Sequence, residues 1–251
     1  MFEKVLSALI VGAVFTAVGI ADCVRAQAQP QLRVGFQDAE PGIVRNNNQL
    51  GGRDIEMWDA ITKDVGFRPT YVILENQSKV LAALDEGKID VAGTALTPTP
   101  ETEAKYHLTD TLFMTAEAVI VPKTDTKAYR GLEDIRGLTF ATLKGSAYAS
   151  YLKQVGITAF KEYDNTPSVM NAVSAGQTNA AIFSGIISGY LLKLGKYPDL
   201  RVVTTYQPAL ARPIMAGFPK TATETYDKVN ASIRKLNADG TIKRVLTNYG
   251  Q

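Results

Sequence analysis

Residues 84–110 read LDEGKIDVAGTALTPTPETEAKYHLTD, and the character of this stretch changes halfway along. Gly87 stands where the end of a helix needs a residue that tolerates a positive φ angle. Ile89, Val91 and Ala92 then form the apolar run of a strand that is covered on both faces. Threonines follow that strand, and in open α/β sheets ligands bind beyond the carboxyl ends of the strands. The stretch therefore predicts a buried strand that ends at a polar binding site.

The segments before this stretch alternate between strand and helix patterns. Residues 32–36 and 70–74 have the apolar content of strands. Asp54 can cap the helix between them, Trp58 lies on its inward face at helical spacing, and Gly66 ends it. Strands that alternate with helices predict a parallel sheet with right-handed crossovers.

A second set of strand and helix patterns begins after residue 116. Apolar runs at 118–121, 138–142 and 180–183 are typical of strands, and helical patterns separate the last two. The apolar run 214–218 brings the chain back, and residues 226–246 finish it with two amphipathic helical patterns. The sequence therefore predicts an α/β protein with two lobes, each a mostly parallel sheet flanked by helices.

The composition is that of an ordinary soluble globular protein. The 251 residues are 45% hydrophobic and 21% charged, and the formal net charge is +2. So small a charge gives no case for a nucleic acid or a membrane surface as a partner. His107 is the only histidine, which excludes a histidine-based metal cluster and a Ser-His-Asp triad. No metal, cofactor or catalytic residue is therefore expected.

The N-terminal segment predicts export. Lys4 gives a basic start, residues 5–21 form an apolar run, and residues 26–28, Ala-Gln-Ala, offer a small-x-small cleavage site. This pattern indicates a secretory signal peptide over residues 1–28 and a periplasmic protein. A retained membrane anchor is the alternative, although the apolar run is marginal for a spanning helix.

Cys23 is the only cysteine and raises the question of a lipoprotein. Asp22 directly before it argues against lipidation, since lipidated cysteines follow a small residue. Cleavage after Ala28 would remove this cysteine, so the mature chain could form no disulfide. Its stability must then rest on a hydrophobic core, for which the chain is long enough.

Residues 90–110 also carry a family resemblance. The pattern is similar to the signature of bacterial periplasmic solute-binding proteins of family 3, the polar amino acid type. That signature runs roughly G-K-x-D-x-x-x-x-x-x-T-x-T-P-E-R and then F-S-D, and the chain follows it without a gap. Residues 237–246 resemble the family's closing pattern, L-x-x-D-G-T-x-x-x-I. The resemblance covers nearly all of the mature chain, but Thr102 stands where the family usually keeps an arginine.

The resemblance implies a type II periplasmic-binding-protein fold, in which two crossover strands join the lobes. Carried over to this chain, residues 32–115 and 218–251 form the first lobe and residues 117–217 the second. Ligand would bind in the cleft between them, and the lobes would close around it by a hinge motion. The implied partner is the permease of an ABC importer, and the chain is expected to act as a monomer.

The resemblance also implies which positions face the ligand. Amino acid binders in the family grip the ligand carboxylate with an arginine, because a guanidinium offers two parallel hydrogen bonds. They hold the ammonium with an acidic residue of the second lobe and stack aromatic residues on the remainder. In this chain Thr102 stands at the arginine position and Ser184 at the acidic position. Glu40 and Gln77 stand at the two aromatic positions. Both halves of the amino acid clamp are missing, so a polar neutral, cationic or modified ligand fits as well as an ordinary amino acid or better.

Hydroxyl groups and a few charges remain as candidates at the ends of strands. Lys144 could hold a carboxylate and Glu40 an ammonium, and the alternative is that both are solvated rim charges. Tyr148 follows the loop that faces the cleft. The complete set of expected ligand-binding residues is Glu40, Gln77, Thr94, Thr97, Thr102, Lys144, Ser146, Tyr148 and Ser184.

Three functions are consistent with these patterns. The first is capture of a small polar solute, an amino acid or a similar metabolite, for an ABC importer. The second is a non-transport receptor or protein-binding module whose cleft has degenerated. The third is a periplasmic lyase that resembles the cyclohexadienyl dehydratases, in which Glu40 would be the candidate acid. The missing arginine at position 102 weighs against this third function.

Overall fold

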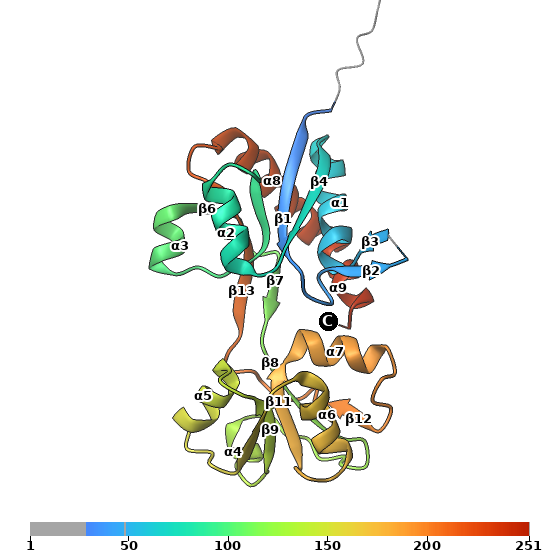
Figure 1. Cartoon of the computed structure of the whole chain (residues 1–251). Coiled ribbons are helices and arrows are strands. Elements are labelled where there is room, and N and C mark those ends of the chain that lie inside the picture. Colours follow the sequence, from blue (N-terminus) through green and yellow to red (C-terminus); the bar gives the residue numbers. More distant parts are fainter. Residues whose placement is uncertain (1–28, 48, 251) are drawn as a thin grey trace, which may run out of the picture.

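The computed structural model describes residues 29–47 and 49–250, together with all side chains of these residues except those at positions 94 and 95. The signal peptide expected over residues 1–28 lies outside the described residues. Within the described part of the chain, no helix is long and apolar enough to cross a membrane. The chain forms two lobes, one above the other in Figure 1.

The first lobe is built on a six-stranded sheet. Its strand order is β4-β1-β5-β13-β6, and β7 pairs with β13 beyond the end of this path. The strands are β1 (Gln31–Gln37), β4 (Arg68–Leu74), β5 (Val91–Leu96), β6 (Tyr106–Leu108), β7 (Phe113–Thr115) and β13 (Arg212–Pro219). The other elements are the hairpin β2 (Val44–Asn46) and β3 (Gln49–Gly51) and the helices α1 (Arg53–Val65), α2 (Gln77–Asp85), α3 (Pro100–Lys105), α8 (Thr223–Ala238) and α9 (Thr241–Asn248).

The second lobe is built on a five-stranded sheet with the strand order β10-β9-β11-β8-β12. Its strands are β8 (Glu117–Pro122), β9 (Phe140–Leu143), β10 (Phe160–Tyr163), β11 (Ala180–Ser184) and β12 (Leu200–Val202). Its helices are α4 (Leu132–Ile135), α5 (Ala147–Gln154), α6 (Thr166–Ser174) and α7 (Gly185–Lys193). In Figure 1 these helices surround the sheet.

Both sheets mix parallel and antiparallel pairs. β1 pairs in parallel with β4 and β5, and β9 pairs in parallel with β10 and β11, as βαβ connections require. The antiparallel pairs all involve β13 or β8, the strands that carry the chain from one lobe to the other. The predicted α/β class, with two lobes and two crossovers, is confirmed. The sheets are mixed and not mostly parallel as expected, because β13 and β8 pair antiparallel with their neighbours.

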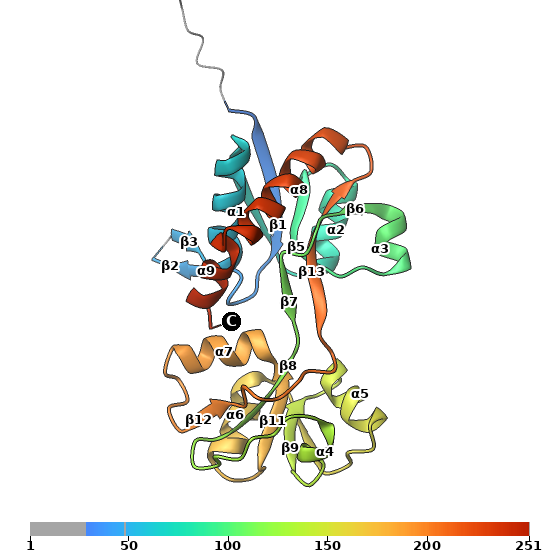
Figure 2. The same ribbon diagram turned by 180° about the vertical axis from the view of Figure 1, so that it is seen from behind.

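The two crossing segments lie side by side. β7 leads into β8 with only Ala116 between them, and β13 returns antiparallel to β7, with Thr115 opposite Arg212. Figure 2 shows both strands running between the lobes. The buried carboxylate of Glu117 accepts hydrogen bonds from the backbone N–H groups of Ala209 (2.6 Å) and Leu210 (2.9 Å). This carboxylate therefore ties the outgoing crossing to the returning one where they meet the second lobe.

Trp58 anchors α1 to the first sheet. Its side chain is fully buried, and its indole Nε1 donates to the carbonyl oxygen of Gly93 at 2.8 Å. A Cβ atom on Gly93 would lie 2.3 Å from Cε1 of Phe36, so only glycine allows this close packing. The prediction that Trp58 belongs to the core is confirmed.

Asp90, the acidic residue at the start of the family signature, fastens β5 to β1. Its carboxylate accepts from the backbone N–H of Arg33 at 2.7 Å and from Nε and Nη2 of the same residue at 3.1 and 2.6 Å. Burial alone would raise the pKa of Asp90, but these hydrogen bonds and the arginine charge outweigh it and hold the pKa below its usual value. The folded state therefore stabilises the ionised form of the Asp90 carboxyl group.

This depressed pKa predicts a loss of stability in acid. Asp90 contributes stability above its unfolded-state pKa of about 3.9, and the contribution is lost as the pH falls through the lower folded-state value. The Asp90→Asn variant should therefore lose less unfolding free energy than the wild type between pH 5 and pH 3. The difference should be about 1 kcal/mol, kept small by the solvent that reaches the pair. Urea denaturation at several pH values measures it.

The control is Asp227→Asn, which removes an exposed carboxylate on α8. This variant should follow the wild-type pH dependence. If the unfolding free energies of the wild type and of Asp90→Asn changed equally with pH, the pair with Arg33 would not depress the pKa of Asp90.

Candidate functional site

A cavity of about 480 Å³ lies between the lobes, against the crossing strands. The first lobe contributes the loop 37–42, the start of α1, Gln77 and Thr97. Phe113 and Ile214 contribute apolar surface from the crossing strands. A neighbouring cavity of about 180 Å³ shares Thr115, Tyr148 and Arg212 with the first. Both lobes and the hinge strands therefore face one interior space.

The N-terminus of α1 is held in place by the loop before it. The backbone N–H groups of Arg53 and Asp54 donate to the carbonyl oxygens of Pro41 (2.9 Å) and Gly42 (3.0 Å). A Cβ atom on Gly42 would lie 2.5 Å from Oδ2 of Asp54, so glycine is needed where the loop passes this carboxylate. These contacts satisfy two N–H groups of the helix end and fix the position of two charged side chains.

Arg53 and Asp54 form a buried ion pair on the cavity wall. Nε of Arg53 donates to Oδ1 of Asp54 at 2.7 Å, and the two side chains are only 8% and 6% exposed. The guanidinium carbon lies 4.2 Å from the ring centroid of Phe113, within the range of a cation–π contact. Nη1 of Arg53 is buried and has no hydrogen-bond partner among the described residues. The guanidinium therefore keeps unused donor capacity beside the cavity.

Arg212 and Tyr148 occupy the junction of the two cavities. Arg212 is exposed at the start of β13 and forms no ion pair with any described residue. Burial raises the pKa of the Tyr148 hydroxyl, and a hydrogen bond with Ser184 and the charge of Arg212 offset only part of this effect. Tyr148 is therefore a neutral hydrogen-bond donor at physiological pH.

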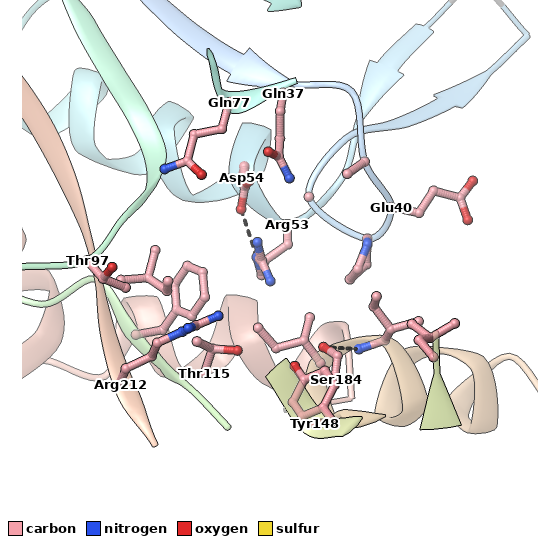
Figure 3. A pocket seen from close by; sticks show the side chains of 18 residues that line it. Gln37, Glu40, Arg53, Asp54, Gln77, Thr97, Thr115, Tyr148, Ser184 and Arg212 are labelled. Atoms are coloured by element: carbon pink, nitrogen blue, oxygen red, sulfur yellow. Dashed lines mark hydrogen bonds and ion pairs between the residues drawn. The ribbon is translucent and has the colours of Figure 1, made fainter. Parts of the chain in front are cut away.

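Five of the residues expected from the sequence line the cavity: Glu40, Gln77, Thr97, Tyr148 and Ser184. Figure 3 shows the carboxylate of Glu40 directed away from the other labelled side chains. Ser184 also caps α7, because its hydroxyl accepts from the N–H of Ile187 at 3.4 Å. The other four expected residues, Thr94, Thr102, Lys144 and Ser146, are not among the described residues that line the cavity.

Thr102 lies in the first turn of α3, and its side chain forms local hydrogen bonds. Its hydroxyl accepts from the N–H of Thr99 and donates to the carbonyl oxygen of Thr97, each at 2.9 Å. With Thr99 it forms a capping box at the start of α3. Neither residue lines the cavity.

Ser146, Lys144 and Thr94 complete the expected set. The Ser146 hydroxyl caps α5 by accepting from the N–H of Ala149 at 3.2 Å. Lys144 is exposed, with Nζ 3.8 Å from Oδ1 of Asp164. Neither Ser146 nor Lys144 lines the cavity. Thr94 lies in β5, and its side chain is not among those described.

Three of the four charged residues that line the cavity, Arg53, Asp54 and Arg212, were not expected from the sequence to contact ligand. One signal in the sequence marks the first of them. Arg53 is a cation in the first turn of a helix, where the helix dipole disfavours positive charge. Arg212 carries no comparable signal, because only the pairing of β13 with β7 brings it to the cleft.

Residues 32–251 match the sequence model of a protein family, the bacterial extracellular solute-binding proteins, family 3. The chain belongs to this family. It is 26% identical to a probable amino-acid-binding protein, YxeM, of Bacillus subtilis over 98% of this chain and 92% of that protein. It is also 26% identical to the glutamate-binding protein GluB of Corynebacterium efficiens, over 98% of this chain and 89% of that protein.

Solved structures show the same fold. The L-cystine solute receptor of Neisseria gonorrhoeae, in its unliganded open conformation, superposes with a TM-score of 0.77 at 19% identity. The superposition covers 88% of this chain and 93% of that receptor. The type II periplasmic-binding-protein fold expected from the signature is therefore confirmed, as is the expected family.

The position of Thr102 predicts a structural effect of its substitution. Thr102→Ala removes the hydroxyl that completes the capping box, so the unfolding free energy should fall by about 1 kcal/mol. Affinity for any solute bound in the cavity should change less than threefold. Urea denaturation and calorimetric titration measure the two effects.

Thr221→Ala, in an exposed turn, is the matched control and should leave both quantities unchanged. A tenfold loss of affinity in Thr102→Ala without a loss of stability would place this hydroxyl on the ligand instead.

Proposed function

We propose that this protein is a periplasmic solute receptor that captures a small polar molecule between its lobes and presents it to the permease of an ABC importer. The observation that carries the proposal is the cavity of about 480 Å³, which is lined by both lobes and by the crossing strands. A ligand there would contact both lobes at once and so stabilise a closed arrangement. Membership of family 3 and the names of the relatives support a small polar solute, an amino acid or a similar polar metabolite.

The proposed moving bodies are residues 32–115 with 218–251, and residues 117–217. The two crossings are the only covalent links between them, and Glu117 holds these links together. Rotation about two adjacent strands needs few changes of backbone angle, as hinge motions generally do. The chain is proposed to work as a monomer, exported by the signal peptide over residues 1–28.

Two observations weigh against the other functions. A degenerate cleft would be filled by the protein's own side chains. The cavity between the lobes is instead open. The candidate acid of a lyase, Glu40, is directed away from the cavity in Figure 3. We therefore propose that the protein performs no chemistry on its ligand.

A thermal denaturation screen tests the receptor function. Residues 29–251 are heated with amino acids, organic acids, betaines, polyamines and small sugars in turn. A ligand at one hundred times its dissociation constant should stabilise the protein by about 2.7 kcal/mol, enough to raise the melting temperature by several degrees. Small-angle scattering with the same compound should show a smaller radius of gyration. No shift with any compound would contradict the proposed function.

The C-terminal segment makes a second contact between the lobes. Nζ of Lys193 on α7 donates to the carbonyl oxygen of Thr247 at 2.5 Å, and the rings of Tyr190 and Tyr249 lie 6.1 Å apart. A Cβ atom on Gly189 would lie 2.3 Å from the carbonyl oxygen of Gly250. Figures 1 and 2 both show the C-terminus beside α7.

Gly189→Ala should weaken this contact without weakening α7. Alanine favours the helix by about 1 kcal/mol, whereas its methyl group overlaps the C-terminal segment. The radius of gyration without ligand should therefore increase while the melting temperature changes by less than about 3 °C. Gly137→Ala, where a methyl group meets nothing within 4 Å, is the control. An unchanged scattering profile in Gly189→Ala would show that this contact does not restrain the lobes.

A further inference from the structure

Two guanidinium groups face the cavity from different parts of the fold. Arg53 is the first residue of α1 in the first lobe, and Arg212 is the first residue of the crossing strand β13. Figure 3 shows both side chains directed into the same space, one from above and one from the side of the hinge. Neither residue stands at position 102, where the family signature has its arginine.

Arg53 is incompletely hydrogen-bonded. Its Nε is engaged by Asp54, but Nη1 is buried and has no partner among the described residues. A buried donor without a partner is unfavourable, and more so when it is charged. The surrounding contacts with Asp54 and the Phe113 ring hold the group in place, so its donors are fixed in position before any ligand arrives.

The negative charges near the cavity do not cancel the second arginine. Asp54 is paired with Arg53. Glu40 is exposed, is directed away from the cavity in Figure 3, and exerts its charge on Tyr190 of α7. Arg212 has no ion pair among the described residues. The buried carboxylate of Glu117, whose charge also acts on Tyr148, is held by backbone N–H groups and does not line the cavity. Arg212 is therefore the one cation among the described lining residues that is free to pair with a ligand charge.

Apart from the crossing strand β13, which carries Arg212, the second-lobe wall has no charged side chain among the described residues. It consists of Leu143, Tyr148, Ser184, Ile186 and Ile187. Apolar side chains and two hydroxyl groups cannot stabilise a buried ammonium group, which would lose its hydration without gaining an anionic partner. A ligand ammonium would thus be unfavourable on this side of the cleft.

We propose that the cleft selects a small dicarboxylate without an ammonium group. One carboxylate binds the edge of the Arg53 guanidinium that lines the cavity, and the other binds Arg212, where Tyr148 can donate a further hydrogen bond. The adjoining cavity of about 180 Å³ at Arg212 and Tyr148 gives room for the second group. This inference rests on the proposed receptor function and names the class of solute.

Calorimetric titration of the mature protein with matched pairs of compounds tests it. The pairs are succinate with L-aspartate, glutarate with L-glutamate, and adipate with L-2-aminoadipate, and each pair differs by one ammonium group. L-Glutamine and L-lysine represent neutral and cationic side chains. At least one dicarboxylate should bind at least tenfold more tightly than its aminated counterpart and than either of the last two compounds.

Substitutions of Arg53 and Arg212 test whether each arginine binds a carboxylate of the ligand. Arg53→Gln should weaken binding of the preferred dicarboxylate at least a hundredfold, and Arg53→Lys, which keeps the charge but loses the planar fork, should fall between this variant and the wild type. Arg212→Gln changes an exposed residue and should weaken binding at least tenfold while the protein stays folded. Arg244→Gln is the matched control, because this arginine on α9 hydrogen-bonds to Thr241 and does not line the cavity.

The outcomes separate this inference from the receptor function. Binding of an aminated or neutral amino acid as tight as that of its dicarboxylate, or full affinity in Arg212→Gln or in folded Arg53→Gln, would overturn the inference and leave the receptor function standing. Absence of a thermal shift with every compound of the wider screen would overturn both. Selective dicarboxylate binding that is lost in the arginine variants would support both.

Discussion

The antiparallel pairing of the two crossing strands is the constraint on which the rest of the molecule depends. β7 and β13 run side by side between the lobes, and Glu117 joins the backbone of both crossings where they meet the second lobe. Because the chain passes between the lobes twice at one place, adjacent strands join the two lobes there. The same pairing puts Thr115, Phe113 and Arg212 on the wall of the cavity. The hinge and the site are therefore parts of one structure.

The site differs from the family signature mainly in where its positive charge is placed. Position 102, where the signature has its arginine, lies in the first turn of α3, and Thr102 there completes the capping box of that helix. Positive charge comes instead from Arg53 at the start of α1, where the helix dipole opposes it. Asp54 and the ring of Phe113 compensate for this unfavourable location. The unsatisfied Nη1 group shows that the compensation is incomplete.

The parts of the chain that the sequence predicted well are those where local pattern and burial agree. Trp58 lies at helical spacing on α1 and is fully buried, and the apolar run after Gly87 is the central strand β5. Asp90 and Asp110, the acidic residues at the two ends of the signature, join β5 to Arg33 and the loop before β7 to Arg234 of α8. These two residues therefore stabilise the fold and do not line the cavity.

The sequence by itself determined the fold class, the two crossovers and the family, because these follow from alternating apolar patterns and from a motif read along the chain. The resemblance placed Glu40, Gln77 and Ser184 at ligand positions, and Thr97 and Tyr148 were expected from the loops after strands; all five line the cavity. Only the tertiary structure decided the charge of the cavity. Arg53 and Arg212 are far apart in the chain, and a β-strand pairing and a folded loop bring them to one space. Whether a hydroxyl faces ligand or caps a helix also depends on geometry, so Thr102 and Ser146 could not be assigned from the residue type alone.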